Sequence, residues 1–387
     1  MIKGEKTMEK SVQLRYFEGE RYNRPDAGNC QWVLDNTFDA LCQLKLRHEL
    51  PSGLYHYVRK DKSCFVLKPD ADISCGHASC QNDPCEICTG CIAFIEYCRK
   101  MQLLSSSQLQ IVENLLRYNL ILPKLKGMPS LNDRASYPPA MPWIFCTTPN
   151  DDSPYQWRNY TDRKEGGYCY CFDVSKLEKA IQRRNGQHKD SVLILLPCYY
   201  LGRDDDAIEQ IFKALLQDMY RDISMLREAK NPSTVDQQIL NRIQGAILTV
   251  APLIKHRKWA HEDEWRLVLI RGCNLSAEQY LPSQLSEVCK HPINLMTAIK
   301  VSPQGNERKL REHIESLNDG VSRMVTASRV SMSVVEHYIK LEDDKLDTRY
   351  ENHVLSQPIG RDVMSQEEFL AELRNNNGKT HLKEIAL

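Results

Sequence analysis

The sequence lacks several features that would point directly to a class of protein. Lysine plus arginine and aspartate plus glutamate both number 51, so the 387-residue chain has no formal net charge. Proteins that coat nucleic acid carry a basic surface, and we therefore expect no strong electrostatic signature of nucleic-acid binding. No apolar run approaches the roughly 20 residues that span a bilayer. Residues 1–10 also lack the apolar centre of a signal peptide. We expect a cytoplasmic protein without a membrane partner.

Familiar catalytic and nucleotide-binding motifs are missing as well. There is no glycine-rich dinucleotide fingerprint, and the segment Gly378-Lys379-Thr380 has no upstream glycine to make it a P-loop. Neither His48-Glu49 nor His261-Glu262 has the second histidine of a zinc-protease helix, and no serine lies in a nucleophile elbow. Any chemistry must therefore come from side chains that the fold brings together.

The pattern of hydrophobic residues predicts an α+β fold. The expected architecture is a mixed or antiparallel central sheet with an inserted pair of long helices and a cysteine-rich segment. We expect strands at residues 54–58, 143–148, 167–173, 192–200, 265–270, 297–301 and 324–330. We expect helices at residues 30–50, 105–120, 305–317 and 365–373, and two further helices that begin at residues 174 and 204. Another helix is expected at residues 235–256, with a break near Pro252. The predicted parts are an N-terminal helical segment (1–51), an α+β core domain (52–333, including the Cys-rich segment 64–98) and a polar C-terminal extension (334–387).

Two short blocks place titratable side chains at the ends of predicted strands, where a sheet can hold them in a fixed pose. The first is Tyr55-His56-Tyr57. The second is Trp259-x-x-Glu262-x-Glu264-Trp265-Arg266, directly before an apolar strand. These blocks are the candidate site, with Glu264 favoured over Glu262 because it adjoins the strand.

Several blocks in order resemble one bacterial domain-of-unknown-function family, which is often found near mobile elements and phage-defence genes. The resemblance spans roughly residues 52–333. The blocks are Leu54-Tyr55-His56-Tyr57, Asn82-Asp83-Pro84-Cys85-Glu86, Cys146-Thr147, Trp157, Tyr160, Gly166, Phe172-Asp173, Lys258-Trp259, Glu262-x-Glu264-Trp265-Arg266 and Ala298-Ile299-Lys300-Val301. The family usually has an aromatic residue where this chain has Cys85, and the cysteine cluster is not a general family feature. The family implies no particular reaction.

A sheet-borne histidine, an aromatic residue and a late glutamate are similar to the parts of the ADP-ribosyltransferase fold, which binds NAD without a glycine loop. This likeness implies an NAD-consuming ADP-ribosyltransferase-like enzyme, such as a toxin or a phage-defence effector. Glu264 would stabilise the positive charge that develops when the nicotinamide–ribose bond breaks, because that transition state has oxocarbenium character. His56 would hydrogen-bond a ribose hydroxyl, and Tyr57 or Tyr160 would stack on a ring. The acceptor is open among protein, nucleic acid and water.

Other interpretations of the same residues stay open. His56 can be a core histidine, and Glu264 can form a structural ion pair with Arg266 or Lys258. A metal-dependent nuclease would use His56, Asp83 and the two glutamates. A non-catalytic sensor or interaction module, stiffened by metal, would need none of them.

Further residues are candidates for a binding surface. Asn82 and Asp83 precede Pro84 in a predicted turn that either lines the pocket or serves only as a turn. Trp157 and Tyr160 belong to an aromatic segment that either stacks on a base or packs in the core. With Tyr55 and Tyr57, these residues complete the predicted NAD-binding set.

The chain contains 15 cysteines, and six candidate metal ligands fall between positions 75 and 91. Without an export signal, cysteines are free thiols or metal ligands more often than disulfides. Pairs separated by two residues can hold a tetrahedral zinc ion, and the triplet spacing also occurs in iron–sulfur sites, although the usual Cys-Pro is missing. Zinc, an iron–sulfur cluster and unliganded thiols are the three alternatives for Cys75, His77, Cys80, Cys85, Cys88 and Cys91.

Overall fold

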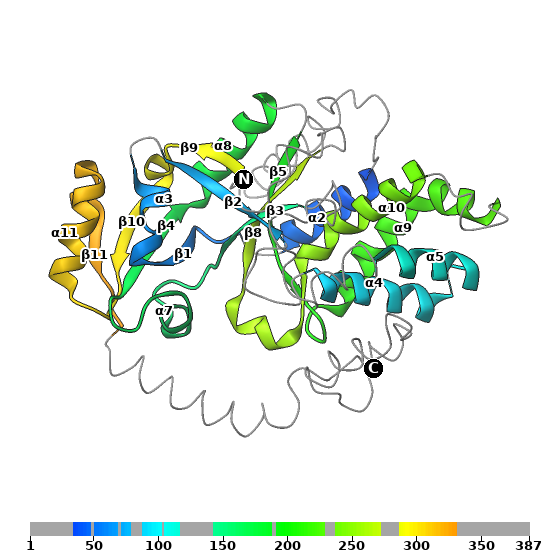
Figure 1. The fold of residues 1–387 in the computed structure, drawn as a ribbon, viewed down its shortest axis with the longest axis horizontal. Helices are drawn as coiled ribbons and strands as arrows, with labels where there is room; N and C mark the ends of the chain where they lie inside the picture. The colour runs from blue at the N-terminus through cyan, green and yellow to red at the C-terminus, as the bar shows by residue number, and fades with distance from the viewer. Residues whose placement is uncertain are drawn as a thin grey trace, which may run out of the picture.

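A five-stranded antiparallel sheet forms the centre of the fold (Figure 1). The computed structural model describes residues 34–47, 50–68, 71–78, 87–102, 104–116, 142–187, 191–228, 237–271 and 286–330. In spatial order the strands of this sheet are β5 (Ser191–Pro197), β8 (Trp265–Arg271), β3 (Trp143–Thr147), β2 (Asp72–His77) and β9 (Ser286–Lys290).

A second, four-stranded sheet packs beside the first. Its order is β1 (Gly53–Arg59), β4 (Gly167–Asp173), β10 (Met296–Val301) and β11 (Val325–Ala327). Only the pair β10–β11 is parallel, so this sheet is mixed. A bridge between Tyr55 of β1 and Thr148, just after β3, ties the two sheets together. The seam between the sheets therefore runs along the Tyr55-His56-Tyr57 block.

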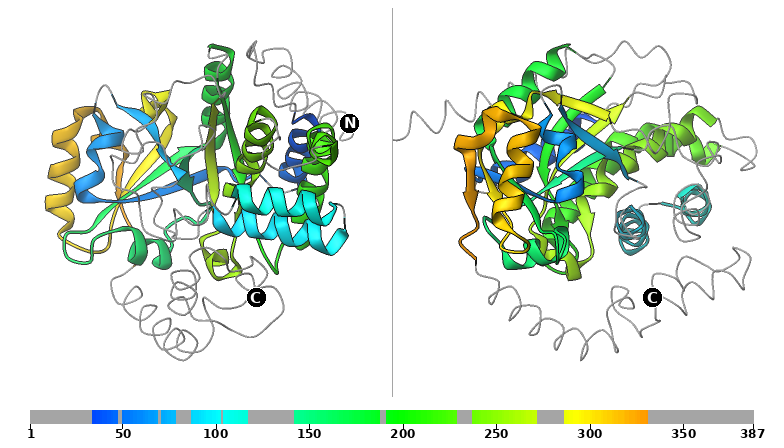
Figure 2. Two further views of the ribbon diagram at one scale, coloured as in Figure 1. Left: turned by 45° about the vertical axis from the view of Figure 1, so that its right-hand side comes forward. Right: turned by 60° about the vertical axis from the view of Figure 1, so that its left-hand side comes forward.

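The central sheet buries both of its faces, and alternate residues separate into two apolar cores. On β5, Leu193 and Leu195 face the second sheet, whereas Ile194 and Leu196 face a layer of helices. This period of two is the geometry of a pleated strand. Figure 2 shows the helices α4, α5, α9 and α10 on one side of the sheet and α11 on the other. The continuous apolar run of β5 follows because neither of its faces meets water.

The helical layer is inserted between two very short strands. It consists mainly of α9 (Asp205–Glu228) and α10 (Gln237–Val250), which lie between β6 (Tyr199–Tyr200) and β7 (Ile254–Lys255). The helices α2 (Asp35–Arg47), α4 (Cys88–Met101) and α5 (Ser106–Leu116) complete it. Asp218 of α9 accepts hydrogen bonds from the side chains of Asn36 and Thr37, both at 2.7 Å, which fixes the start of α2.

The remaining helices surround the second sheet and the seam. They are α3 (Cys64–Leu67), α7 (Pro154–Tyr160), α8 (Val174–Gln187) and α11 (Glu307–Leu317), with the 3₁₀ turns η1 (Lys60–Lys62), η7 (Arg257–Glu262), η9 (Pro292–Leu295) and η10 (Asp319–Met324). The turn η6 (Ala251–Leu253) packs in the helical layer instead. Asp173 accepts a hydrogen bond from the Lys176 amide at 3.0 Å, as an N-cap for α8 should.

The predicted α+β class, the mixed and antiparallel sheets and the inserted pair of long helices are confirmed. The predicted break of helix 235–256 near Pro252 is confirmed, but the residues after the break do not continue as an α-helix. Pro252 cannot continue an α-helix, so α10 stops at Val250 and Ile254–Lys255 becomes a strand. The predicted strand 192–200 is two strands, and the last strand covers only Val325–Ala327. Strands β2 and β9 were not predicted, and the helix predicted at 365–373 and the extension 334–387 lie outside the described residues.

Candidate functional site

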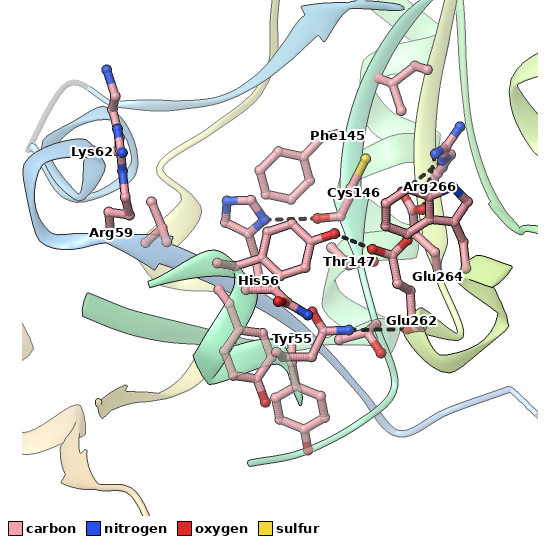
Figure 3. A pocket seen from close by; sticks show the side chains of 18 of the residues that line it. Tyr55, His56, Arg59, Lys62, Phe145, Cys146, Thr147, Glu262, Glu264 and Arg266 are labelled. Atoms are coloured by element: carbon pink, nitrogen blue, oxygen red, sulfur yellow. Dashed lines mark hydrogen bonds and ion pairs between the residues drawn. The ribbon is translucent and has the colours of Figure 1, made fainter. Parts of the chain in front are cut away.

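A cavity of about 550 Å³ opens at the seam between the two sheets. Its walls come from β1, β3, α7, η7 and the start of β8, so segments far apart in the sequence meet there (Figure 3). Six of the predicted site residues line it: Tyr55, His56, Tyr57, Tyr160, Glu262 and Glu264. Its volume is typical of sites that bind small molecules.

The two glutamates reach the cavity through a turn rather than along one strand. Glu262 ends η7, and Asp263 adopts a left-handed conformation with φ of 44° before Glu264 and β8 follow. Aspartate tolerates this conformation better than most residues. The turn brings the carboxylates of Glu262 and Glu264 to one common partner, although one residue separates them in the sequence. They are 4% and 6% exposed, so their charges must be compensated within the protein.

Lys255 is that common partner. Its Nζ atom lies 2.6 Å from Oε2 of Glu262 and 2.6 Å from Oε2 of Glu264. Strand β7 carries it, and only 5% of the residue is exposed. The Trp259 ring lies 5.5 Å from the same ammonium, a favourable cation–π distance. A buried ammonium therefore bridges the two carboxylates.

Arg266 holds Glu264 from the other side. Its Nε and Nη2 atoms donate to Oε1 and Oε2 of Glu264 at 2.8 and 3.0 Å, a two-point pairing that fixes the carboxylate plane. Its Nη1 atom donates to the carbonyl oxygen of Pro252. The predicted structural pairing of Glu264 with Arg266 is thus present, whereas the second cation on Glu264 is Lys255 and not Lys258.

Helix α7 supplies the contacts of Glu262. The Tyr160 hydroxyl donates to Oε1 of Glu262, and Nε2 of Gln156 donates to its backbone carbonyl at 3.4 Å. Glu262 therefore has one cation and one neutral donor, while Glu264 has two cations. This asymmetry distinguishes the two carboxylates chemically.

The protonation of the two glutamates follows the same asymmetry. Burial alone would raise both pKa values, but the charges of Arg266 and Lys255 outweigh it at Glu264 and hold its pKa well below the usual range. Burial dominates at Glu262, where Lys255 offsets it only in part and the Glu264 charge adds to it, so the pKa of Glu262 is raised. Paired carboxyl groups whose pKa values are pushed apart are a feature of catalytic sites.

His56 lies between the glutamates and the opposite end of the cavity (Figure 3). Its Nδ1 atom is 2.8 Å from the Cys146 carbonyl oxygen, which can only accept, so Nδ1 carries the hydrogen and Nε2 is an acceptor. Burial lowers the pKa of His56 to about 4, and the hydrogen bond to Cys146 only partly opposes this. Near neutral pH the ring is uncharged and can accept a hydrogen bond from a ligand hydroxyl.

The far end of the cavity is basic. Arg59, at the end of β1, and Lys62, in η1, line it on the side away from Glu262 and Glu264 (Figure 3). Arg59 is exposed and pairs with Asp61 at 3.3 Å on the surface. The cavity therefore has a carboxylate-bearing end and a cationic end.

The predicted aromatic residues divide between the cavity and the core. Tyr55, Tyr57 and Tyr160 line the cavity, but Trp157 is fully buried and does not. The Trp157 ring meets Tyr57 edge-on at 4.8 Å, and its Nε1 donates to Asp152 at 2.8 Å. Trp157 thus supports Tyr57 from behind. Asn82 and Asp83 lie outside the described residues.

The described members of the predicted metal set lie in two separate apolar cores. Cys75 packs in the core between the two sheets, whereas Cys88 and Cys91 pack among the helices. Burial raises the pKa of Cys91 to about 12, which keeps this thiol neutral. His77 is buried and meets the Trp143 ring edge-on. Within the described ranges no three histidine, cysteine or acidic residues are grouped to hold an ion, and Cys80 and Cys85 fall outside those ranges.

Sequence reasoning missed Lys255, Arg59 and Lys62. Lys255 fell within a predicted helix and carried no local signal. Arg59 and Lys62 belong to an ordinary run of charged residues after β1, and only the tertiary structure places them at the cavity.

Residues 156–267 match the model of a family described as a protein of unknown function, DUF2971. This confirms the predicted resemblance to a family of unknown function, while the individual short blocks and the likeness to ADP-ribosyltransferases stay predictions. The matched range includes Tyr160, Lys255, Glu262, Glu264 and Arg266. No curated protein and no solved structure matches the chain. None of the helices that the structure describes has the length and apolarity needed to cross a membrane.

Proposed function

We propose that the cavity binds NAD and that the protein breaks the nicotinamide–ribose bond, as an ADP-ribosyltransferase or an NAD glycohydrolase. The observation that carries this proposal is the polarity of the cavity, with a buried glutamate pair at one end, Arg59 and Lys62 at the other and a neutral His56 between them. NAD fits this arrangement, because its anionic pyrophosphate can pair with Arg59 and Lys62 and the positive charge that develops on its ribose can face Glu262, whereas Lys255 and Arg266 compensate the two carboxylates before the reaction.

Glu262 is the better candidate for the carboxylate that faces the reacting ribose, although the sequence favoured Glu264. Both oxygens of Glu264 are held by Arg266, and Lys255 also contacts one of them. Glu262 has less positive charge around it, so its ionised form gains more when a cation develops nearby. An interaction that strengthens in the transition state accelerates the reaction.

The proposed reaction proceeds in two steps. The bond between C1′ of the ribose and the nicotinamide nitrogen breaks, and its electron pair leaves with nicotinamide, which becomes neutral. The resulting oxocarbenium ion lies beside the Glu262 carboxylate. The oxygen or nitrogen of an acceptor then attacks C1′, and its proton passes to Glu262 and on to solvent. A raised pKa suits this last role, because a general base works best near the ambient pH.

The other lining residues would orient the substrate. Nε2 of His56 would accept a hydrogen bond from a ribose hydroxyl, and the Tyr160 hydroxyl keeps the Glu262 carboxylate in place. Arg59 and Lys62 would contact the pyrophosphate, since cations are the usual partners of phosphate.

The acceptor is proposed as protein, nucleic acid or water, and the balanced net charge favours none of them. NAD consumption fits an effector or toxin acting in the cytoplasm during bacterial conflict or phage defence. This biological role rests on the family resemblance and not on the cavity.

Release of nicotinamide tests the proposal, with and without added cell lysate as a source of acceptor. The variant is Glu262→Gln, which keeps the size of the side chain. The matched control is Glu113→Gln, since Glu113 is also buried and is paired with Arg99, but in the helical layer. We expect release by the wild type and by Glu113→Gln, and a loss of at least about 100-fold in Glu262→Gln. No release by the wild type under either condition would overturn the proposal.

A metal-dependent nuclease is supported less by the same residues. Such an enzyme needs carboxylates that converge on a cation with oxygen ligands. Here Lys255 already bridges Glu262 and Glu264, and Arg266 takes both oxygens of Glu264. A non-catalytic interaction module would release no nicotinamide even as the wild type, so the same assay separates it from the enzyme.

A further inference from the structure

Lys255 lies at the centre of the charged end of the cavity. Its ammonium is 2.6 Å from both carboxylates, whereas the ion pair of Arg266 is with Glu264. Without Lys255, Arg266 would be the cation left to compensate both buried carboxylates, and it already pairs with Glu264. Two carboxyl groups that share a buried site do not readily ionise at the same time, because their negative charges repel each other.

We propose that Lys255 is a positioning residue: by bridging both carboxylates it keeps Glu262 beside the cavity and lets it ionise. The inference deepens the proposed NAD chemistry and, for the effect on turnover, rests on it. Its effect on the charge of the glutamate pair is independent of any ligand.

The surroundings of the pair contain further groups that titrate or carry charge. The groups that act on the pair are Lys255 of β7, Arg266 of β8, Tyr160 of α7, Tyr200 of β6 and Cys146 of β3. Lys258 of η7 lies over the Trp259 ring, with its ammonium 5.0 Å from the ring centroid. Burial raises the pKa of both tyrosines beyond the range of ordinary titration, and acidic neighbours add to this effect. Lys255 and Arg266 are therefore the two cations that compensate the pair directly.

Loss of Lys255 changes the dependence of stability on pH in a defined direction. The pKa of Glu262 is already raised in the folded protein. A group of this kind contributes stability at low pH that is lost as the pH rises through its folded pKa. In Lys255→Met that pKa rises further, so the loss of stability with rising pH becomes larger. A lysine that served only for packing would lower stability equally at every pH.

The test measures the thermal midpoint from pH 5 to pH 9 for the wild type, Lys255→Met, Lys255→Arg and the double variant Lys255→Met/Glu262→Gln. We expect the thermal midpoint of Lys255→Met to fall more steeply with rising pH than that of the wild type. Lys255→Arg should restore most of the wild-type profile because it restores the charge. In the double variant the extra pH dependence should disappear, since glutamine cannot ionise. Parallel profiles for the wild type and Lys255→Met would overturn the proposal.

The double variant provides a test even if Lys255→Met does not fold. If Lys255→Met fails to fold, the double variant should fold, because the uncompensated second carboxylate has been removed. Failure of the double variant as well would count against the proposal.

Turnover gives a second, separate readout. If the wild type releases nicotinamide, the rising limb of its pH–rate profile should move upward by about one pH unit in Lys255→Met, which is a tenfold loss at a pH on that limb. A limb that does not move contradicts the positioning role. If the wild type releases none, the proposed function fails while the stability profiles still decide the role of Lys255.

Discussion

Replacement of Glu264 by glutamine should destabilise the protein far more than the same replacement at Glu262. In the wild type, Oε1 of Glu264 accepts from Arg266, and Oε2 accepts from both Arg266 and Lys255. Glutamine has one acceptor oxygen and one NH₂ group. Whichever way the amide is turned, its NH₂ meets an N–H donor of a buried cation, so Arg266, which is fully buried, loses part of its compensation.

The expected magnitude follows from removing one partner of a buried ion pair, which costs about 3–5 kcal/mol. At Glu262 the amide oxygen can still accept from Lys255, while the amide NH₂ can donate to the Tyr160 hydroxyl. The Tyr160 O–H then loses its acceptor, while Lys255 keeps Glu264 as its ionic partner, and the cost should be about 1–2 kcal/mol. One kcal/mol shifts the melting temperature of a domain of this size by roughly 2–4 °C. We therefore expect a drop of at least about 6 °C for Glu264→Gln and a much smaller one for Glu262→Gln.

Thermal unfolding followed by circular dichroism at pH 7 measures this difference. Glu113→Gln serves as the control for losing a buried carboxylate outside the cavity. Equal melting temperatures for Glu264→Gln and Glu262→Gln would refute the assignment of the two glutamates to different roles.

Three further predictions concern the histidine, the basic end and the cysteines. The pKa of His56 is about 4 in the folded protein and 6.5 in the unfolded chain, so its contribution to stability is present above pH 6.5 and is lost as the pH falls toward 4. His56→Gln should therefore make the thermal midpoint depend less on pH between 6.5 and 4, and an unchanged pH dependence would contradict the prediction. Replacing Arg59 and Lys62 together by alanine should raise KM for NAD about tenfold with little change in kcat, while Arg308→Ala, at a surface ion pair in α11, should change neither. Cys75→Ala should leave the metal content measured by elemental analysis unchanged, because Cys75 packs in a different core from Cys88 and Cys91; a loss of metal in this variant would show that the prediction is wrong.

The parts of the fold that were predictable are those with a strong local pattern. Residues 265–270 form an apolar run directly after charged residues, and β8 begins at Trp265 as expected. Asp173 sits before an amphipathic stretch and caps α8. In both cases local sequence and tertiary packing favour the same structure.

The candidate site was predictable in its glutamates and histidine but not in its cations. Ile254 and Lys255 form a two-residue strand because they pair with Tyr199 and Tyr200, a contact between segments more than fifty residues apart. No local periodicity can reveal such a pairing. The close packing of α4 against η6 also depends on a contact between distant segments. A Cβ atom at Gly90 would lie 2.4 Å from the Ala251 carbonyl oxygen, and the carbonyl oxygen of the next residue, Pro252, accepts the hydrogen bond from Arg266.

The sequence also could not assign separate roles to Glu262 and Glu264. Their spacing of two suggested one strand face, but the left-handed residue Asp263 turns the chain between them. Their difference arises from partners on β7, β8 and α7, which only the tertiary structure brings together.

The most direct test of the proposed function is a crystal structure of the Glu262→Gln variant with NAD, since the slowed reaction should leave the substrate intact. We expect NAD in the cavity, with the nicotinamide riboside beside Tyr160 and the substituted side chain at position 262, a ribose hydroxyl on Nε2 of His56 and the pyrophosphate beside Arg59 and Lys62. Binding elsewhere, or the reverse orientation with the pyrophosphate at the glutamates, would contradict the proposed site and its chemistry.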